Sequence, residues 1–505
     1  MFRKVLIANR GEIAVRILRA CRDLDIQTVA VYSEADRRSL HVRYADEAYP
    51  VGPALARKSY LRIDRILAAA RESGAEAIHP GYGFLAENPE FASACQEAGI
   101  TFVGPPASAI AAMGDKVAAR RIMQQAGVPI IPGTGTDLRD AEIVAQGDQL
   151  GYPLFVKAAA GGGGKGMRLV QDRDELERSL GAARREAQKA FGDDRVYLER
   201  AVRGARHVEI QVLADGHGGV IHLGERECSI QRRHQKLVEE APSPAVSEDL
   251  RQRMGQVAVR AAEAVGYANA GTVEFLLDRD GSFYFLEMNT RLQVEHPVTE
   301  SITGLDLVKE QLRIADGEPL GYRQEDIRIQ GWAIECRITA EDPFNNFLPA
   351  SGRVIRLFQP SGPGIRLDGG LYEGLEVSLY YDPLLAKLIA WGPSRTEAVQ
   401  RMRRALREFR IVGLPTSIPF HRWVMEDPQF LSGRYDTSFL DHHPALAKPE
   451  REGYRQWAAI VATLLSHQQR RQGRLAASPV DEVNGVDGWK PGKGWKLAGR
   501  WEAQK

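Results

Sequence analysis

The run from Glu287 to Pro297 carries the residue types best suited to metal and acid–base chemistry. Its polar side chains recur at every second position, so an extended backbone would place them on one face. Just upstream, strand-like stretches at 273–278 and 283–286 flank Asp280-Gly281, a dipeptide that favours a tight hairpin. Strands paired about this dipeptide would set Glu274 directly opposite Glu287. The alternating residues are Glu287, Asn289, Arg291, Gln293 and Glu295.

Facing carboxylates of this kind predict a cation site. Two carboxylates at roughly 5 Å across a strand pair repel each other unless something neutralises them. Mg²⁺ prefers carboxylate and amide oxygens and shares them with substrate phosphates. The alternative is a surface hairpin whose carboxylates point into water. The apolar flanks, and Arg291 and Glu295 on the same face, favour the metal site.

A glycine-rich run at residues 160–166 follows a predicted strand at 153–157. Where the backbone is fixed, each glycine costs roughly 0.5–1 kcal/mol relative to alanine, which indicates a use for the run. Backbone N–H groups closing over phosphate oxygens would be such a use, with Lys165 adding charge. The run is not a Walker loop, because Lys-Ser or Lys-Thr is absent at the required spacing. A flexible surface loop is the alternative.

Two further segments indicate walls of a cleft. The predicted strand 206–212 alternates, with His207, Glu209 and Gln211 on one face and Val208, Ile210 and Val212 on the other. Residues 231–236 form a basic cluster, which favours an anion-binding rim beside the metal pair and the glycine run. Alternatively, His207 is an ordinary hydrogen-bonded histidine and the basic cluster is a solvated face.

The elements that must position these residues indicate an α/β fold. A strand at 4–8, a helix at 11–24 and a strand at 28–32 predict a doubly wound layer at the N-terminus. A dinucleotide site is not supported, because GxGxxG is missing from this opening. A strand ending at 77–80 precedes the loop 81–88, and loops at strand carboxyl ends face a ligand crevice. A later strand at 384–391 and helix at 395–409 predict a third αβ unit.

Composition excludes several classes of protein. The 505 residues carry 67 basic and 66 acidic side chains, a net charge of +1, so we expect no nucleic-acid or membrane partner. The four cysteines lack CxxC spacing, which argues against disulfides and zinc and favours a reducing compartment. Apolar runs stay well short of 18 residues and a signal-peptide pattern is missing at the N-terminus, so a cytoplasmic location is expected.

The last 60 residues differ in character from the rest. An apolar stripe at helical spacing is followed by a loop and by tryptophans, and four of the seven tryptophans lie beyond residue 450. This tail either packs on the body of the protein or provides a docking surface for a partner. The stripe and the late tryptophans are Tyr454, Trp457, Ile460, Val461, Leu464, Leu465, Trp489, Trp495 and Trp501.

Taken together, these segments resemble the biotin carboxylases, ATP-grasp enzymes that carboxylate protein-linked biotin. The resemblance covers residues 2–445 and rests on matched segments in fixed order. These are 7–14, 79–85, 113–116, 206–211, 231–236, 287–297 and 335–338. It implies an ATP-grasp fold with an N-terminal doubly wound domain and a C-terminal α+β domain. The expected divisions are 1–112, 113–330 with a mobile lid at about 130–203, 331–445, and an extension at 446–505.

The resemblance also implies a role for individual residues. Glu295 would be the base that deprotonates bicarbonate, and Arg337 would stabilise the enolate of biotin. The catalytic set would be Lys236, Arg291, Glu295 and Arg337, and the metal ligands Glu274, Glu287 and Asn289. Bicarbonate and biotin would contact Tyr82, Lys236, Arg291, Gln293, Val294 and Arg337. The nucleotide would contact Lys116, Lys157, Gly163, Gly164, Glu199, Arg200, Ala201, Val202, His207, Gln231, His234 and Leu276.

The implied reaction is ATP-dependent carboxylation of biotin with bicarbonate through carboxyphosphate, the first half-reaction of an acetyl-CoA or other acyl-CoA carboxylase. Its cofactors would be ATP, Mg²⁺ or Mn²⁺, and carrier-bound biotin, without zinc or haem. Its partners would be a biotin carboxyl carrier protein, a carboxyltransferase and a second copy of the chain. Pyruvate or 2-oxoglutarate could replace the acyl-CoA as acceptor. Two rival functions stay open at this point: a carbamoyl-phosphate-type synthetase and a non-catalytic nucleotide-binding subunit.

Two features depart from the family or lack a role. The glycine run has Ala160 and Lys165 where related enzymes often carry glycine and arginine, so the details of lid closure are open. Cys228 lies close to the predicted anion rim, and we assign it no role.

Overall fold

The structure is a computed structural model that describes residues 1–136, 138–159, 167–202, 204–443 and 460–467. The chain divides into two units, Met1–Leu446 and Ala447–Lys505. In the second unit, residues 460–467 are helical. Four apolar side chains of that helix, Ile460, Val461, Leu464 and Leu465, are 49–63% exposed. Among the helices described, none has the length and apolar character needed to cross a membrane.

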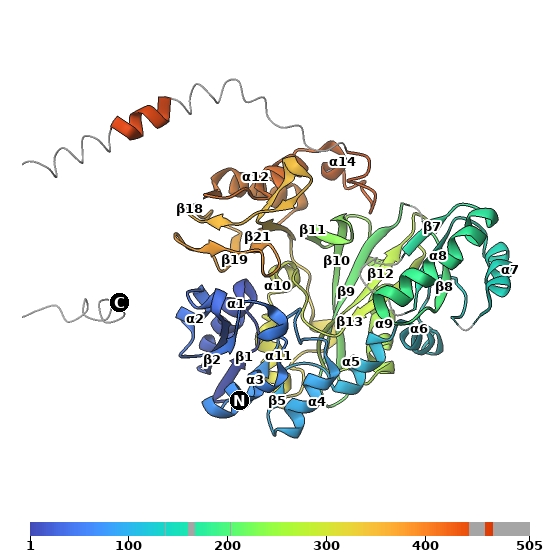
Figure 1. Ribbon diagram of the computed structural model, residues 1–505, viewed down its shortest axis with the longest axis horizontal. Coiled ribbons are helices and arrows are strands. Elements are labelled where there is room, and N and C mark those ends of the chain that lie inside the picture. The colour runs from blue at the N-terminus through green and yellow to red at the C-terminus, as the bar shows by residue number, and fades with distance from the viewer. Residues whose placement is uncertain (137, 160–166, 203, 444–459, 468–505) are drawn as a thin grey trace, which may run out of the picture. The chain divides into compact units, whose positions relative to one another are not determined.

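The N-terminal part is a five-stranded parallel sheet in the order β3-β2-β1-β4-β5, drawn in blue in Figure 1. Val5 and Ile7 of β1 enter one core, whereas Leu6 of β1 and Ala8, directly after the strand, enter another. Helices therefore cover both faces, which confirms the predicted doubly wound layer. The elements are β1 (Lys4–Ile7), α1 (Gly11–Asp23), β2 (Gln27–Ser33), α2 (Leu40–Tyr44), β3 (Glu47–Gly52), α3 (Ile63–Ser73), β4 (Ala77–His79), α4 (Pro89–Glu97), β5 (Thr101–Phe102) and α5 (Ala107–Gly114).

The strand order reverses between β1 and β4, so the loops after these two strands open a crevice at their carboxyl ends. Asn9 Nδ2 ties the two loops together by donating to the carbonyl oxygens of Pro80 and Tyr82 at 2.7 and 2.8 Å. The loop 81–88 therefore lies where the sequence predicted it.

A small antiparallel sheet, β7-β6-β8, follows in the chain. The long helix α8 packs across these strands (Figure 1), and the shared core includes Leu154, Val156, Leu176 and Leu198. The glycine run 160–166 lies outside the described residues. The elements are α6 (Lys116–Gln125), α7 (Asp140–Leu150), β6 (Leu154–Ala158), β7 (Met167–Val170), α8 (Arg173–Phe191) and β8 (Val196–Arg200).

An eight-stranded antiparallel sheet in the order β13-β12-β9-β10-β11-β14-β21-β19 forms the centre of the first unit. It runs without interruption past residue 330, because β11 pairs with β14. Its strands are β9 (Arg206–Ala214), β10 (Val220–Arg232), β11 (Gln235–Ala241), β12 (Asn269–Leu277), β13 (Phe283–Asn289), β14 (Trp332–Thr339), β19 (Ile365–Gly369) and β21 (Leu384–Gly392).

Helices and short strand pairs surround this sheet. The helices are α9 (Glu248–Ala264), α10 (His296–Thr303), α11 (Leu307–Ala315), α12 (Arg395–Glu408), α13 (Ile418–Val424) and α14 (Pro428–Leu431). The strand pairs are β15 (Glu341–Asp342) with β16 (Leu348–Pro349), β17 (Gly352–Arg353) with β20 (Glu376–Val377), and β18 (Arg356–Phe358) with β22 (Arg410–Val412). Single 3₁₀ turns are η1 (Glu34–Asp36), η2 (Ala56–Lys58), η3 (Gln324–Asp326) and η4 (Pro343–Asn345).

The hairpin of β12 and β13 places Glu274 opposite Glu287, as the sequence predicted. The simple pairing about Asp280-Gly281 fails nearer the turn, where Phe275 pairs with Phe285, because Leu286 is an extra residue that bulges out of the ladder. The expectation of one extended face as far as Glu295 is also wrong. The strand ends at Asn289, and residues 290–295 form an irregular turn that leads into α10.

Candidate active site

A cavity of about 1220 Å³ lies between the crevice of the N-terminal sheet, the polar face of the central sheet and the β6–β8 sheet. Most of the residues predicted from the sequence line it. Glu295 does not, because it is completely buried beneath the cavity wall, and Ala201 does not line it either. Gly163 and Gly164 lie outside the described residues. The predicted residues that line it are Tyr82, Lys116, Lys157, Glu199, Arg200, Val202, His207, Gln231, His234, Lys236, Glu274, Leu276, Glu287, Asn289, Arg291, Gln293, Val294 and Arg337. Residues that were not predicted, Glu12 of α1 among them, line it as well.

Glu274 and Glu287 differ in their electrostatic environment. Burial would raise the pKa of Glu274, but Lys236 and His207 hold it well below its usual value. Its Oε2 lies 2.7 Å from His207 Nε2, and its Oε1 accepts from Asn289 at 2.9 Å. Burial and the charge of Glu274 raise the pKa of Glu287, which lacks a hydrogen-bond partner among the described residues. An unpartnered carboxylate facing an ionised one fits a divalent cation, with Glu274, Glu287 and Asn289 as the oxygen donors.

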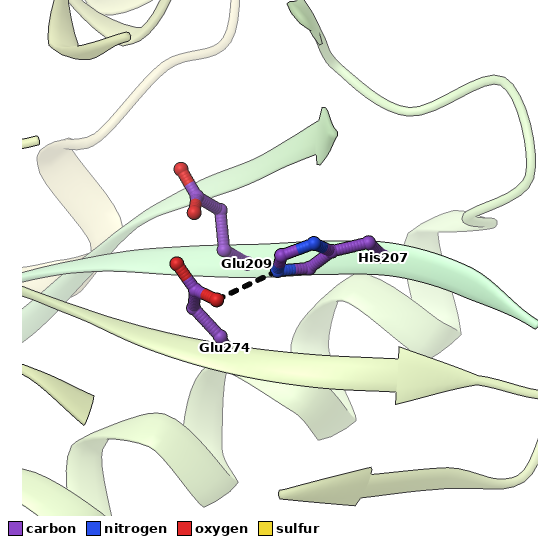
Figure 2. A group of neighbouring side chains, drawn as sticks. All are labelled: His207, Glu209 and Glu274. Atoms are coloured by element: carbon purple, nitrogen blue, oxygen red, sulfur yellow. Dashed lines mark hydrogen bonds and ion pairs between the residues drawn. The ribbon is translucent and has the colours of Figure 1, made fainter. Parts of the chain in front are cut away.

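Lys236 lies at the centre of a buried acidic group. Its Nζ is 2.5 Å from Glu209 Oε2, 2.9 Å from Glu274 Oε1 and 2.6 Å from Glu295 Oε1. Figure 2 shows His207 and Glu209 on β9 with Glu274 on the neighbouring strand. These three residues have metal-ligand spacing. The lysine ammonium already supplies positive charge there, so the Glu274–Glu287 pair fits a cation better than this group does.

Glu295 is held between two cations. In addition to Lys236, Arg337 donates to its Oε2 at 2.9 Å. Burial would raise the pKa of Glu295, but Lys236 and Arg337 lower it below its usual value. Glu295 is therefore ionised and can accept a proton. Arg337 itself is anchored by Glu239, which accepts from its Nε at 2.6 Å.

The guanidinium of Arg291 donates to three side chains and, at 3.3 Å, to the backbone carbonyl oxygen of Leu292. It donates to Glu87 Oε2 at 2.7 Å, and to Gln293 Oε1 and Asn289 Oδ1 at 2.9 Å each. Glu87 comes from the loop 81–88 after β4, so the crevice of the N-terminal sheet orients a cation of the central site.

Where the β6–β8 sheet lines the cavity, Lys157 contacts Glu199, whose other oxygen accepts from Arg120 Nη1 at 2.6 Å. His234 has a left-handed backbone with φ of 65°. Burial and the nearby Lys157 lower the pKa of His234, so its imidazole is neutral. A neutral ring can donate or accept a hydrogen bond at a base or a ribose.

Sequence reasoning missed several residues that support this site. Arg226 is fully buried; it contacts Glu209 and donates to Gln211 Oε1 at 2.7 Å and to Thr272 Oγ1 at 3.0 Å. Glu87, Arg120 and Glu239 were also missed. Only Glu87 had a signal, its place in the loop after a predicted strand. Cys228 Sγ lies 4.0 Å from Glu295 Oε1 and is buried, and burial raises its pKa well above the usual value, so it is a neutral thiol.

Three family models match consecutive parts of the chain. The N-terminal domain of biotin carboxylase matches residues 1–110, and the biotin carboxylase C-terminal domain matches 335–442. The ATP-binding domain of the carbamoyl-phosphate synthase L chain matches residues 115–323. The predicted family resemblance is thereby confirmed.

Individual proteins are similar over most of the chain. A pyruvate carboxylase subunit of Methanothermobacter thermautotrophicus is 55% identical over 88% of this chain and 90% of its own length. Biotin carboxylase 1 of Bacillus subtilis is 53% identical over 88% of this chain and 100% of its own length. The biotin carboxylase domain dimer of Hydrogenobacter thermophilus 2-oxoglutarate carboxylase, solved with MgADP, ADP and bicarbonate, has a TM-score of 0.84 at 51% identity. That match covers 88% of this chain and 98% of the solved chain.

Proposed function

The chain belongs to the biotin carboxylase family and is an ATP-dependent ligase, and we propose that it carboxylates biotin on a separate carrier protein with bicarbonate. It has the ATP-grasp fold. The observation that carries the proposal is Glu295 held between Lys236 and Arg337, next to the facing Glu274 and Glu287. This arrangement combines a base, anion-binding cations and a place for magnesium nucleotide.

In the first step, bicarbonate would bind between Arg291 and Lys236. Glu295 would take its proton, because a positioned carboxylate within hydrogen-bond reach acts as a general base. The bicarbonate oxygen then attacks the γ-phosphate of ATP, and ADP leaves. Lys116 and Lys157 would neutralise the phosphates. Mg²⁺ held by Glu274, Glu287 and Asn289 would stabilise the charge that develops on the phosphoryl oxygens; Mn²⁺ is the alternative metal.

In the second step, carboxyphosphate breaks down to CO₂ and phosphate beside biotin. The phosphate would take the ureido proton, and the guanidinium of Arg337 would stabilise the resulting enolate oxygen. The enolate nitrogen then attacks CO₂. Tyr82 would line the biotin side, with Gln293 and Val294 beside bicarbonate. The remaining nucleotide contacts would come from Glu199, Arg200, Ala201, Val202, His207, Gln231, His234, Leu276 and the lid residues Gly163 and Gly164.

We propose an acyl-CoA such as acetyl-CoA as the final acceptor, reached through a separate carboxyltransferase in the cytoplasm, and a homodimer as the working form. Pyruvate and 2-oxoglutarate are alternatives, because similar proteins carry those names. The extension 446–505 would dock the partner subunits, supported by its four exposed apolar side chains. Co-purification of the untagged partners with the full chain, and with a chain ending at 445, tests both statements.

Turnover assays test the reaction itself. We expect ATP cleavage that depends on bicarbonate and is stimulated by free biotin. Residues 115–323 match the ATP-binding domain of the carbamoyl-phosphate synthase L chain, so one rival function stays open. This rival is a carbamoyl-phosphate-type synthetase, which also makes carboxyphosphate. Stimulation by ammonia instead of biotin would support that rival. Arg337 argues against it, because this residue lies within the match to the biotin carboxylase C-terminal domain.

A further inference from the structure

Lys387 is a fully buried lysine in β21 that lies outside the lining of the cavity. Its Nζ donates to the backbone carbonyl oxygen of Val294 at 2.9 Å. It also lies 3.3 Å from Oε2 of Glu12, in the first turn of α1, and 5.8 Å from the ring centroid of Tyr82. The ammonium of Lys387, on β21, therefore contacts both the start of α1 and the turn before α10.

This ion pair is costly to bury. Glu12 is only 4% exposed, and neither of its carboxylate oxygens accepts a hydrogen bond among the described residues. Burial raises the pKa of Glu12 to about 7, although Lys387 opposes the shift. Apolar side chains of the same volume often stabilise a fold as well as a buried ion pair does. The pair therefore points to a use other than stability.

The hydrogen bond to Val294 indicates that this use is to position the backbone next to Glu295. A peptide group is planar, so fixing the carbonyl oxygen of Val294 fixes the plane that leads into the backbone of Glu295. The carboxylate of Glu295 is held by Lys236 and Arg337 on the cavity side. Lys387 holds the peptide between Val294 and Glu295, which lies in a segment without regular structure.

We propose that Lys387 is a positioning residue for the bicarbonate step: it holds the Val294–Glu295 peptide so that the base faces bicarbonate, with Glu12 as its buried counter-ion. The proposal rests on the proposed role of Glu295. It concerns the binding and deprotonation of bicarbonate and leaves the ATP contacts untouched.

Two variants separate positioning from stability. Lys387→Met removes the donor and leaves Glu12 without its cation, so it should lower both the thermal midpoint and turnover. Glu12→Gln/Lys387→Met removes both charges and should recover the thermal midpoint. The double variant still lacks the donor to Val294, so kcat/KM for bicarbonate should stay at least tenfold below wild type. KM for ATP should stay within about twofold. Lys4→Met, which breaks a strand lysine–glutamate pair away from the cavity, is the matched control.

The outcomes are distinct. A double variant that recovers both stability and bicarbonate kcat/KM would show that Lys387 is merely structural, and one no more stable than Lys387→Met would refute the pairing with Glu12. A wild-type protein without bicarbonate-dependent ATP cleavage would refute the proposed function instead. Equal losses in KM for ATP and for bicarbonate would also contradict positioning.

Discussion

Replacing Glu295 with glutamine tests the centre of the proposed mechanism. Both carboxylate oxygens accept from cations, Oε1 from Lys236 and Oε2 from Arg337. A glutamine has the same shape but only one oxygen, so in either orientation its NH₂ group faces a donor. The variant can no longer take a proton from bicarbonate.

The effect on turnover should be far larger than the effect on folding. A positioned general base contributes about 10²–10⁴ in rate, so we expect bicarbonate-dependent turnover to fall by at least about 10²-fold. Lys236 keeps Glu209 and Glu274, and Arg337 keeps Glu239, so neither cation loses all its partners. Loss of one charged hydrogen bond costs about 1.5–3 kcal/mol, which a folded chain of this size should tolerate.

The assay is release of ADP with saturating ATP and free biotin, measured as a function of bicarbonate concentration. Glu225→Gln is the matched control, because Glu225 is also fully buried and is bound by Arg251 at 2.7 and 2.9 Å. Its partner Arg251 lies outside the cavity lining, whereas Lys236 and Arg337, the partners of Glu295, line the cavity. The control should lose stability and keep its turnover. Turnover of Glu295→Gln within tenfold of wild type, with the variant folded, would refute the assignment of the base.

Three further perturbations have definite expected outcomes. Glu287→Gln should raise the Mg²⁺ concentration needed for half-maximal activity at least tenfold, and should raise the thermal midpoint without Mg²⁺ because it removes a like-charge pair; an unchanged Mg²⁺ dependence would contradict the ligand set. Glu87→Gln should raise KM for bicarbonate about tenfold with KM for ATP unchanged, because Arg291 loses its anchor; steady-state kinetics would show the reverse pattern if Glu87 served the nucleotide. Burial opposes ionisation of Asp36, but Arg10 lowers its pKa to about 2, below the usual 3.8. Its stabilisation is therefore complete above pH 4 and lost as the pH falls towards 2. The difference in thermal midpoint between wild type and Asp36→Asn should shrink from pH 5 to pH 3, and a constant difference would exclude this linkage.

Local periodicity of the sequence was sufficient to predict the strands and helices that carry the site. The opening strand–helix–strand unit was predicted to within about a residue at each end, because its buried faces set the pattern. The alternation of 206–212 places Val208, Ile210 and Val212 in a core and leaves His207 at the cavity. The pairing of Glu274 with Glu287 was correct even though the turn geometry behind it was not, because the bulge at Leu286 shifts only the pairs nearer the turn.

What could not be predicted is the set of partners that hold the functional side chains. Glu87 and Arg291 are 204 positions apart, and Glu12 and Lys387 lie in different parts of the fold. Such contacts depend on how the sheets pack, and the residue periodicities of single strands and helices do not determine that packing. The end of β13 at Asn289 was missed for the same reason. Residues 290–295 keep an alternating pattern, yet the turn into α10 is fixed by contacts with other segments: Arg291 with Glu87, Gln293 with Glu274, and Val294 with Lys387.

The central position of Lys236 implies that metal and bicarbonate binding are coupled. Without ligands, its ammonium neutralises Glu274 and Glu295 at once. A divalent cation at Glu274 and Glu287 would neutralise Glu274 in place of Lys236. Lys236 could then turn its N–H groups to bicarbonate. We predict that a magnesium nucleotide analogue tightens bicarbonate binding at least tenfold, about 1.4 kcal/mol, and that bicarbonate tightens the nucleotide equally. Titration calorimetry in both orders measures this coupling. The coupling should weaken in Glu274→Gln, where Lys236 is already freed from one carboxylate. If wild type binds bicarbonate with equal affinity with and without nucleotide, Lys236 serves bicarbonate alone and the coupling is refuted.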